Sequence, residues 1–228
     1  MNPVLKAAKS LVPPALGARL HRLFDDEGRA ARDADDRRAP RTALEPSHVA
    51  PCTVLVDREA LLAHLPHGGV VAEVGVDHGA FSQRILEATR PSHLHLIDVW
   101  GSERYHDGLF ELVTDTFRPQ TEAGEATIHR ALSVDAAARF PASTFDWVYL
   151  DTDHSYETTR DELRAYAPLV KPEGLIAGHD YVMGNWGSGY RYGVMEAVHE
   201  FCAAEGWALR YVTASLTEKA SFAIQRLR

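Results

Sequence analysis

The sequence is poor in cysteine, in long apolar runs and in continuous basic stretches. Its 228 residues include only 2 cysteines, Cys52 and Cys202, which lie far apart and form no CxxC pair. That spacing excludes a disulfide framework and a zinc cluster, and it predicts two reduced thiols in a cytoplasmic protein. No run approaches the roughly 18 apolar residues that a membrane-spanning helix needs.

The N-terminal segment imitates a signal peptide only superficially, because the double proline at 13–14 interrupts its short apolar run. Residues 1–24 are instead predicted to form an amphipathic helix that docks on the domain, on a second copy or on a membrane surface, with protein preferred. Residues 25–42 hold 11 charged residues and are typical of a linker. We therefore expect an N-terminal segment over 1–48, through which the chain could self-associate, and one domain over 49–228.

The charge balance is acidic, with 24 Lys and Arg against 32 Asp and Glu and a net charge of -8. A protein that binds nucleic acid normally carries a basic patch, and none is present outside the first 42 residues. The composition therefore favours a small-molecule partner over nucleic acid.

From Val54 onward, apolar strand patterns alternate with helical patterns. The last two strands are joined by the polar connection "SLTEK", which is typical of an antiparallel hairpin. This pattern predicts an α/β Rossmann-like sheet of seven strands, mostly parallel, with helices on both faces and ligands at the carboxyl ends of its strands. The predicted strands cover 70–75, 93–100, 125–132, 145–153, 174–181, 208–214 and 221–227.

The stretch "VVAEVGVDHGAF" reads as a buried strand, an open turn and the start of a helix. Gly75 and Gly79 allow the backbone to approach a ligand, and the helix start offers free amide groups. A dinucleotide site would carry a third glycine, and an acid such as Glu73 would repel a pyrophosphate but attract a cationic group. The turn therefore favours a ligand with an ammonium or sulfonium centre, such as S-adenosylmethionine. His78, inside the turn, could contact the carboxylate of that ligand or face water.

The next strand ends in "LIDVW". Asp98 lies where a carboxylate can accept both ribose hydroxyls of a nucleoside. Trp100 follows, and it could either lie beside the adenine or pack beneath the turn.

The segments "EVGVDHG", "LIDVW", "FDWVYLDTDHSYE" and "GLIAGHDY" give residues 50–228 a resemblance to the class I S-adenosylmethionine-dependent methyltransferases. Within that class the chain resembles the small bacterial O-methyltransferases related to macrocin O-methyltransferase and the cephalosporin hydroxylase-like proteins. The resemblance implies that Glu73, Gly75 and Gly79 surround the methionine moiety, that Asp98 binds the ribose, and that Ser133 in "ALSVD" lies near the adenine.

Two strand ends carry an unusual density of acids and histidines, with Asp151 and His154 after one strand and His179 and Asp180 after its predicted neighbour. Metal-dependent relatives place metal-binding acids at matching positions, which implies a divalent metal at Asp151, His179 and Asp180. A histidine ligand would shift preference from Mg²⁺ toward manganese, iron or zinc. The alternative is a metal-free site in which His154 or His179 acts as general base.

A glycine-rich segment with three aromatic residues, Val182 to Gly193, follows this cluster, and aromatic faces suit sugar rings or aromatic acceptors. The leading hypothesis is therefore an S-adenosylmethionine-dependent O-methyltransferase that acts on a hydroxyl of a small molecule, such as a sugar or a natural-product glycoside. The alternatives are a nicotinamide-dependent oxidoreductase and a non-catalytic cofactor-binding scaffold.

Overall fold

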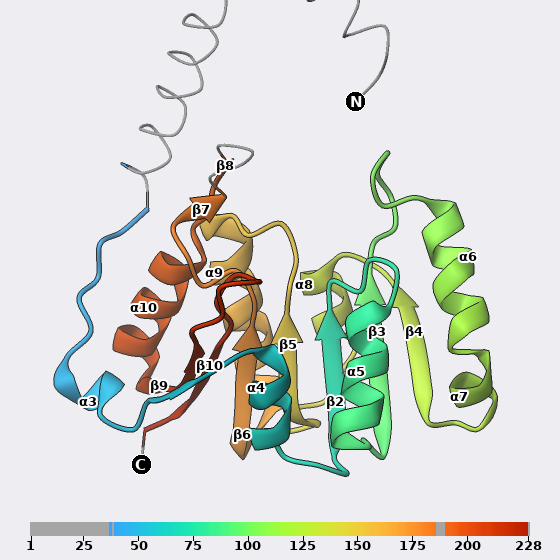
Figure 1. Ribbon diagram of the computed structural model, residues 1–228, viewed down its shortest axis with the longest axis horizontal. Coiled ribbons are helices and arrows are strands. Elements are labelled where there is room, and N and C mark those ends of the chain that lie inside the picture. Colours follow the sequence, from blue (N-terminus) through green and yellow to red (C-terminus); the bar gives the residue numbers. More distant parts are fainter. Residues whose placement is uncertain (1–36, 38, 186–189, 228) are drawn as a thin grey trace, which may run out of the picture.

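The computed structural model describes residue 37, residues 39–185 and residues 190–227. Its centre is an eight-stranded sheet with the strand order β1-β9-β10-β6-β5-β2-β3-β4 (Figure 1). Two further short strands, β7 and β8, pair separately. The strands are β1 (Thr53–Leu55), β2 (Val70–Val74), β3 (His93–Asp98), β4 (Ala126–Arg130), β5 (Phe145–Leu150), β6 (Val170–Gly178), β7 (Gly184–Asn185), β8 (Tyr190–Arg191), β9 (Trp207–Thr213) and β10 (Phe222–Arg226).

The predicted architecture is confirmed, with one correction to the strand number. Strands β2 to β6 run parallel, and β10 pairs antiparallel with both β6 and β9, which gives the expected C-terminal hairpin. The sheet has eight strands rather than seven because β1 adds to its edge, parallel to β9. β1 is only three residues long and two of its residues are exposed, so it has no strand periodicity that the sequence could reveal.

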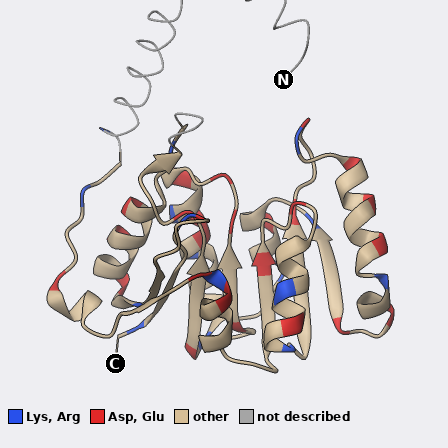
Figure 2. Cartoon of the chain, in the orientation of Figure 1, with Lys and Arg blue, Asp and Glu red and all other residues tan. Residues whose placement is uncertain are grey.

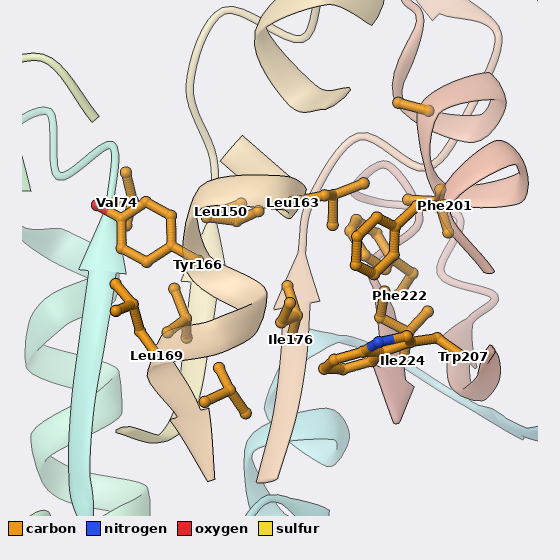
Figure 3. Close-up of a cluster of buried hydrophobic side chains, with 14 of the residues drawn as sticks. Val74, Leu150, Leu163, Tyr166, Leu169, Ile176, Phe201, Trp207, Phe222 and Ile224 are labelled. Carbon is orange, nitrogen blue, oxygen red and sulfur yellow. The ribbon is translucent and has the colours of Figure 1, made fainter. Parts of the chain in front are cut away.

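Helices cover both faces of the sheet. One face packs against α4, α5 and α6, and the other packs against α8, α9 and α10 in the aromatic-rich core of Figure 3. The helices are α3 (Pro46–Val49), α4 (Arg58–His64), α5 (Ala80–Thr89), α6 (Asp107–Thr116), α7 (Arg118–Glu122), α8 (Ser133–Ala137), α9 (Tyr156–Tyr166), the 3₁₀ turn η1 (Ala167–Leu169) and α10 (Val194–Glu205).

Residues just before the predicted domain start at residue 49 also pack against the core. Leu44 packs against the core, and His48 in α3 is buried. The proposed N-terminal helix at 1–24 and most of the linker at 25–42 lie outside the described residues. Among the described residues, no helix is long and apolar enough to cross a membrane.

The parallel strands end together at one edge of the sheet. Val74 of β2 is in register with Ile97 of β3 and Leu150 of β5, and Leu150 is in register with Gly178 of β6. The residues after these strands therefore meet at this edge, which is the upper one in Figure 1. In the view of Figure 2, basic positions are scattered among acidic ones, as the sequence composition predicts.

Candidate active site

The turn after β2 contains two glycines with left-handed backbone angles, Gly75 at φ 95° and Gly79 at φ 83°. Neither has room for a side chain. A Cβ on Gly75 would lie 1.9 Å from the carbonyl oxygen of Asp151, and one on Gly79 would lie 2.7 Å from the ring of Phe117. The sequence predicts that both glycines let a ligand approach the backbone closely. The structure adds that packing within the chain already requires them.

Asp98 fastens this turn to the end of β3. Its Oδ2 accepts hydrogen bonds from the amides of Val76 and Asp77, each at 2.9 Å, and its Oδ1 accepts one from the amide of Trp100 at 3.2 Å. A carboxylate has about four acceptor sites, so Asp98 retains capacity for a ribose hydroxyl. Its predicted role is compatible with this position.

Trp100 is fully buried and packs beneath the turn. Its Nε1 donates to the carbonyl oxygen of Asp77 at 2.9 Å, and its ring lies 5.3 Å from that of Phe110. This position corresponds to the packing alternative, since the buried indole presents no face to the opening. His78 is exposed, with its Nδ1 2.8 Å from the carboxylate of Asp77.

Glu73 lies inside the fold beneath the turn, with 1% of its surface exposed. Ser82 of α5 donates a hydrogen bond to its carboxyl group. Burial raises the pKa of Glu73 to about 8, so the group retains its proton at neutral pH. Its place beside the methionine moiety stays a prediction, and its hydrogen bond to Ser82 ties α5 to β2.

Ser133 begins α8, after β4 at the same edge of the sheet. Its carbonyl oxygen accepts a hydrogen bond from the hydroxyl of Tyr166 at 2.8 Å. Ser133 is partly exposed, so an adenine ring could reach it. Its role beside the adenine stays a prediction.

Asp151, His154 and Asp180 form a compact group after β5 and β6, with potential metal-ligand atoms all within 4.8 Å of one another. His154 Nε2 lies 3.1 Å from Asp180 Oδ2. The backbone is left-handed at His154, with φ 64°, and at Asp180, with φ 54°. Such angles are costly for residues with side chains and are often found at functional sites.

His179 lies beside this group rather than within it. Its Nδ1 is 3.8 Å from Asp151 Oδ2 and 3.7 Å from Asp180 Oδ1. The group that could hold a metal ion thus contains His154, whereas the sequence predicts His179 as a ligand. Two buried atoms of the region, His179 Nε2 and Asp180 Oδ1, accept or donate no hydrogen bond among the described residues.

The site shifts the acidity of its members in different directions. Burial raises the pKa of Asp151 against the opposing effect of His179 and His154. Burial lowers the pKa of His154, although Asp180 and Asp151 oppose this. For Asp180, burial is outweighed by His179, His154 and Lys219, and the pKa is lowered. At neutral pH, His154 is thus uncharged and Asp180 is ionised.

Three charged residues of the site were missed from the sequence. Arg58 Nη1 lies 3.8 Å from Asp151 Oδ2, and Glu218 receives a 2.8 Å hydrogen bond from the amide of Arg58. Lys219 Nζ lies 3.2 Å from Asp180 Oδ1. Glu218 and Lys219 belong to the "SLTEK" connection, which gave only a turn signal. Arg58 opens α4, and the only sequence signal was a positive charge at a helix start, where the helix dipole disfavours it.

Aromatic residues surround a surface hollow next to the cluster. Tyr156 at the start of α9 and the pair Tyr190 and Tyr192 line it, together with Arg191 and Gly193. Tyr192 also contacts the cluster, because its ring lies 4.9 Å from that of His154.

Comparison with known proteins agrees with this architecture. The model of a family described as a methyltransferase domain matches residues 72–181, from β2 to just past β6. The fold resembles a SAM-dependent methyltransferase from Aquifex aeolicus, at a TM-score of 0.54 and 14% identity over 85% of this chain and 97% of that one. It also resembles the M1A22 tRNA methyltransferase TrmK of B. subtilis, at a TM-score of 0.53 and 13% identity over 76% of this chain and 67% of that one. A search of the curated proteins gave no match.

The chain thus contains a match to a methyltransferase domain over residues 72–181, within a Rossmann-like methyltransferase fold that has a C-terminal antiparallel hairpin. The nicotinamide-dependent alternative is not favoured by these findings.

Proposed function

We propose that the protein transfers a methyl group from S-adenosylmethionine to a hydroxyl group of a small molecule, such as a sugar or a glycosylated natural product. The observation that carries this proposal is the group of Asp151, His154 and Asp180, which opens at the same sheet edge as the glycine turn. Methyl transfer to a hydroxyl requires a group that removes the hydroxyl proton, and this cluster offers one.

The glycine turn fits the cofactor. The amides in the first turn of α5, which begins at Ala80, have no partner within the helix and can donate hydrogen bonds to the carboxylate of the methionine moiety. Asp98 retains acceptor capacity for the ribose. S-adenosylmethionine supplies the methyl group on a positively charged sulfur. The S–CH₃ bond breaks with its electron pair left on sulfur, an O–CH₃ bond forms, and the hydroxyl proton passes to a base.

Asp151, His154 and Asp180 would hold a divalent cation if the site uses one. Their mixed nitrogen and oxygen donors suit manganese, iron or zinc better than magnesium. A bound cation would lower the pKa of an acceptor hydroxyl. In this structure Lys219 Nζ lies 3.2 Å from Asp180 Oδ1 and Arg58 Nη1 lies 3.8 Å from Asp151 Oδ2, so both positive charges already oppose the acids.

The same residues support a metal-free route. His154 is uncharged at neutral pH because burial lowers its pKa, so it can accept a proton. Asp180, 3.1 Å from His154 Nε2, would stabilise the imidazolium that results. The two routes differ in whether removal of metal abolishes activity.

The acceptor would bind in the hollow lined by Tyr156, Tyr190 and Tyr192. Tyrosine rings provide apolar faces and hydroxyl groups, a combination that suits sugar rings. Because Tyr192 also contacts His154, an acceptor held there would lie next to the proposed base.

Transfer of a labelled methyl group tests this proposal. Full-length protein, treated with EDTA and then assayed alone or with Mn²⁺ or Mg²⁺, would be incubated with methyl-labelled S-adenosylmethionine and a panel of sugars and glycosides. We expect label on an acceptor oxygen, located by mass spectrometry. Label on nitrogen or carbon, or no transfer to any hydroxyl compound, would contradict it. Activity only with added metal would select the metal route.

A further inference from the structure

The tyrosine-lined hollow proposed for the acceptor has one wall that comes from a distant part of the sequence. Most of its lining belongs to two stretches, residues 155–157 at the start of α9 and residues 190–193 in and after β8. Among the described lining residues, Ala39 alone comes from outside these stretches. The segment before α3 therefore completes the hollow.

Residues 40–45 pack against the domain as an extended segment. Thr42 and Leu44 are partly buried, whereas the residues at 41, 43 and 45 are exposed. This alternation is expected where an extended chain turns one face toward the protein and the other toward solvent. Leu44 also packs against the aromatic-rich core. The segment is therefore attached to the domain by its own side chains, which hold the neighbouring Ala39 at the hollow.

Helix α10 connects this extended segment to the other walls of the hollow. Glu196 pairs with Arg191, and Glu200 accepts a 2.5 Å hydrogen bond from the hydroxyl of Tyr156. His199 interacts with the backbone of the extended segment, which Figure 1 shows in blue beside α10. Residues three and four apart lie on one helix face. One face of α10 therefore holds the two stretches and the extended segment together.

The lining of the hollow favours an uncharged ring as its ligand. Tyr156 and Tyr190 present ring faces and hydroxyl groups, which suit sugar and aromatic rings. Arg191 is already paired with Glu196, so the described lining residues leave no unpaired positive charge for an acidic ligand. The hollow has a volume of about 230 Å³, below the roughly 300–1,000 Å³ of sites for drug-sized ligands. A larger side chain at position 39 would therefore fill a large share of it.

We propose that Ala39 and the extended segment behind it form part of the acceptor site, and that the small side chain at position 39 determines which sugar or aromatic ring fits against the tyrosines. Ala39 is then a specificity-determining residue that contacts the acceptor and takes no part in removing its proton. The assignment of the hollow to the acceptor rests on the function proposed above, whereas its capacity to bind a ring does not.

Binding of a neutral glycoside tests this wall without any assay of methyl transfer. Full-length protein, with and without S-adenosylhomocysteine, would be titrated with phenyl β-D-glucopyranoside, which carries both kinds of ring, and the Kd measured by saturation-transfer NMR. We expect the wild type to bind the glycoside, and Ala39→Trp to bind it at least about tenfold more weakly because the indole ring overfills the hollow. No binding by the wild type would overturn the proposal.

A second alanine of the same segment gives the matched control. Ala43 is exposed, so Ala43→Trp adds the same side chain on the outer face and should change the Kd less than about twofold. Thermal unfolding would verify that each variant is folded. If Ala39→Trp does not fold, Ala39→Leu should show a smaller loss of affinity in the same direction. Equal Kd values for the variants at positions 39 and 43 would overturn the proposal.

Kinetics separate this proposal from the proposed function. For an acceptor that the wild type methylates, Ala39→Trp should raise KM about tenfold, as is typical for the loss of a binding contact. Its affinity for S-adenosylhomocysteine should stay unchanged, because the glycine turn does not line the hollow. Methyl transfer to hydroxyl groups with equal KM in Ala39→Trp and Ala43→Trp would contradict this proposal alone. A protein whose glycoside binding depends on position 39, but which methylates no hydroxyl compound, would contradict the proposed function alone.

Discussion

The glycine turn and the acid–histidine cluster lie at the same sheet edge but differ in how far the chain satisfies their polar groups. In the turn, the Asp98 carboxylate accepts three backbone amides and Glu73 is bonded to Ser82. In the cluster and beside it, Asp180 Oδ1 and His179 Nε2 are buried without a hydrogen bond among the described residues.

The difference indicates that the turn is preformed for binding, whereas the cluster keeps polar groups free for chemistry. The turn is preformed by its own hydrogen bonds and packing, so a cofactor meets a rigid surface and little ordering is needed on binding. The cluster keeps polar capacity and two left-handed residues, His154 and Asp180, which the fold holds at an energetic cost. We therefore expect substitutions in the turn to affect folding and cofactor binding, and substitutions in the cluster to affect catalysis.

The largest expected effect comes from breaking the turn. Gly75→Ala places a Cβ against the carbonyl oxygen of Asp151 at φ 95°, and should lower the free energy of unfolding by about 3 kcal/mol or more. Gly68→Ala is the matched control, because Gly68 has φ 74° but no atom within 4 Å of a Cβ, so only about 1 kcal/mol is expected. Urea denaturation measures both. Equal losses would show that packing does not fix the turn.

Removing the charge of the cluster should affect the rate next most strongly. Asp180→Asn keeps the shape of the side chain but removes the negative charge beside His154, so kcat should fall by about 100-fold. Asp153→Asn is the control, because Asp153 is exposed and its carboxylate bonds the amide of Ser155 and the hydroxyl of Thr158. It should leave kcat nearly unchanged. A similar kcat for both variants would show that the cluster takes no part in methyl transfer.

A third prediction concerns stability against pH, in a region that neither site uses. Burial lowers the pKa of His95 to about 4, and His95 Nδ1 lies 2.9 Å from His129 Nε2. The unfolded chain takes up a proton near pH 6.5, and the folded chain does not until about pH 4. Stability should therefore fall as pH drops through this window, by at most about 1.4 kcal/mol per pH unit for this group. Urea denaturation of His95→Phe should give a flatter profile; an unchanged slope would contradict this.

The smallest effect is expected from Arg58, which opposes the raised pKa of Asp151. Arg58→Leu should raise that pKa further, because it removes a nearby positive charge. The acidic limb of the pH–rate profile should then move to higher pH. Arg84→Leu, at an exposed position on α5, is the control. If the acidic limb moves equally in both variants, or in neither, Arg58 has no specific effect on the pKa of Asp151.

Local periodicity predicted most of the fold, because buried parallel strands and amphipathic helices leave clear patterns. It missed β1, which is too short to show one. The same limit applies to the site. Gly75 directly follows β2 and Asp98 is the last residue of β3, so a strand pattern locates both. Arg58 and Lys219 reach the site only through tertiary folding, and in sequence each resembles an ordinary helix or turn residue.

Titration with S-adenosylhomocysteine by calorimetry tests the central division between the two regions most directly. The wild-type protein should bind it, Asp98→Asn should bind at least about tenfold more weakly because the turn loses a charged acceptor, and Asp180→Asn should bind within about twofold of the wild type. No binding by the wild type, or a loss confined to Asp180→Asn, would contradict the assignment of the cofactor to the glycine turn and of the chemistry to the cluster.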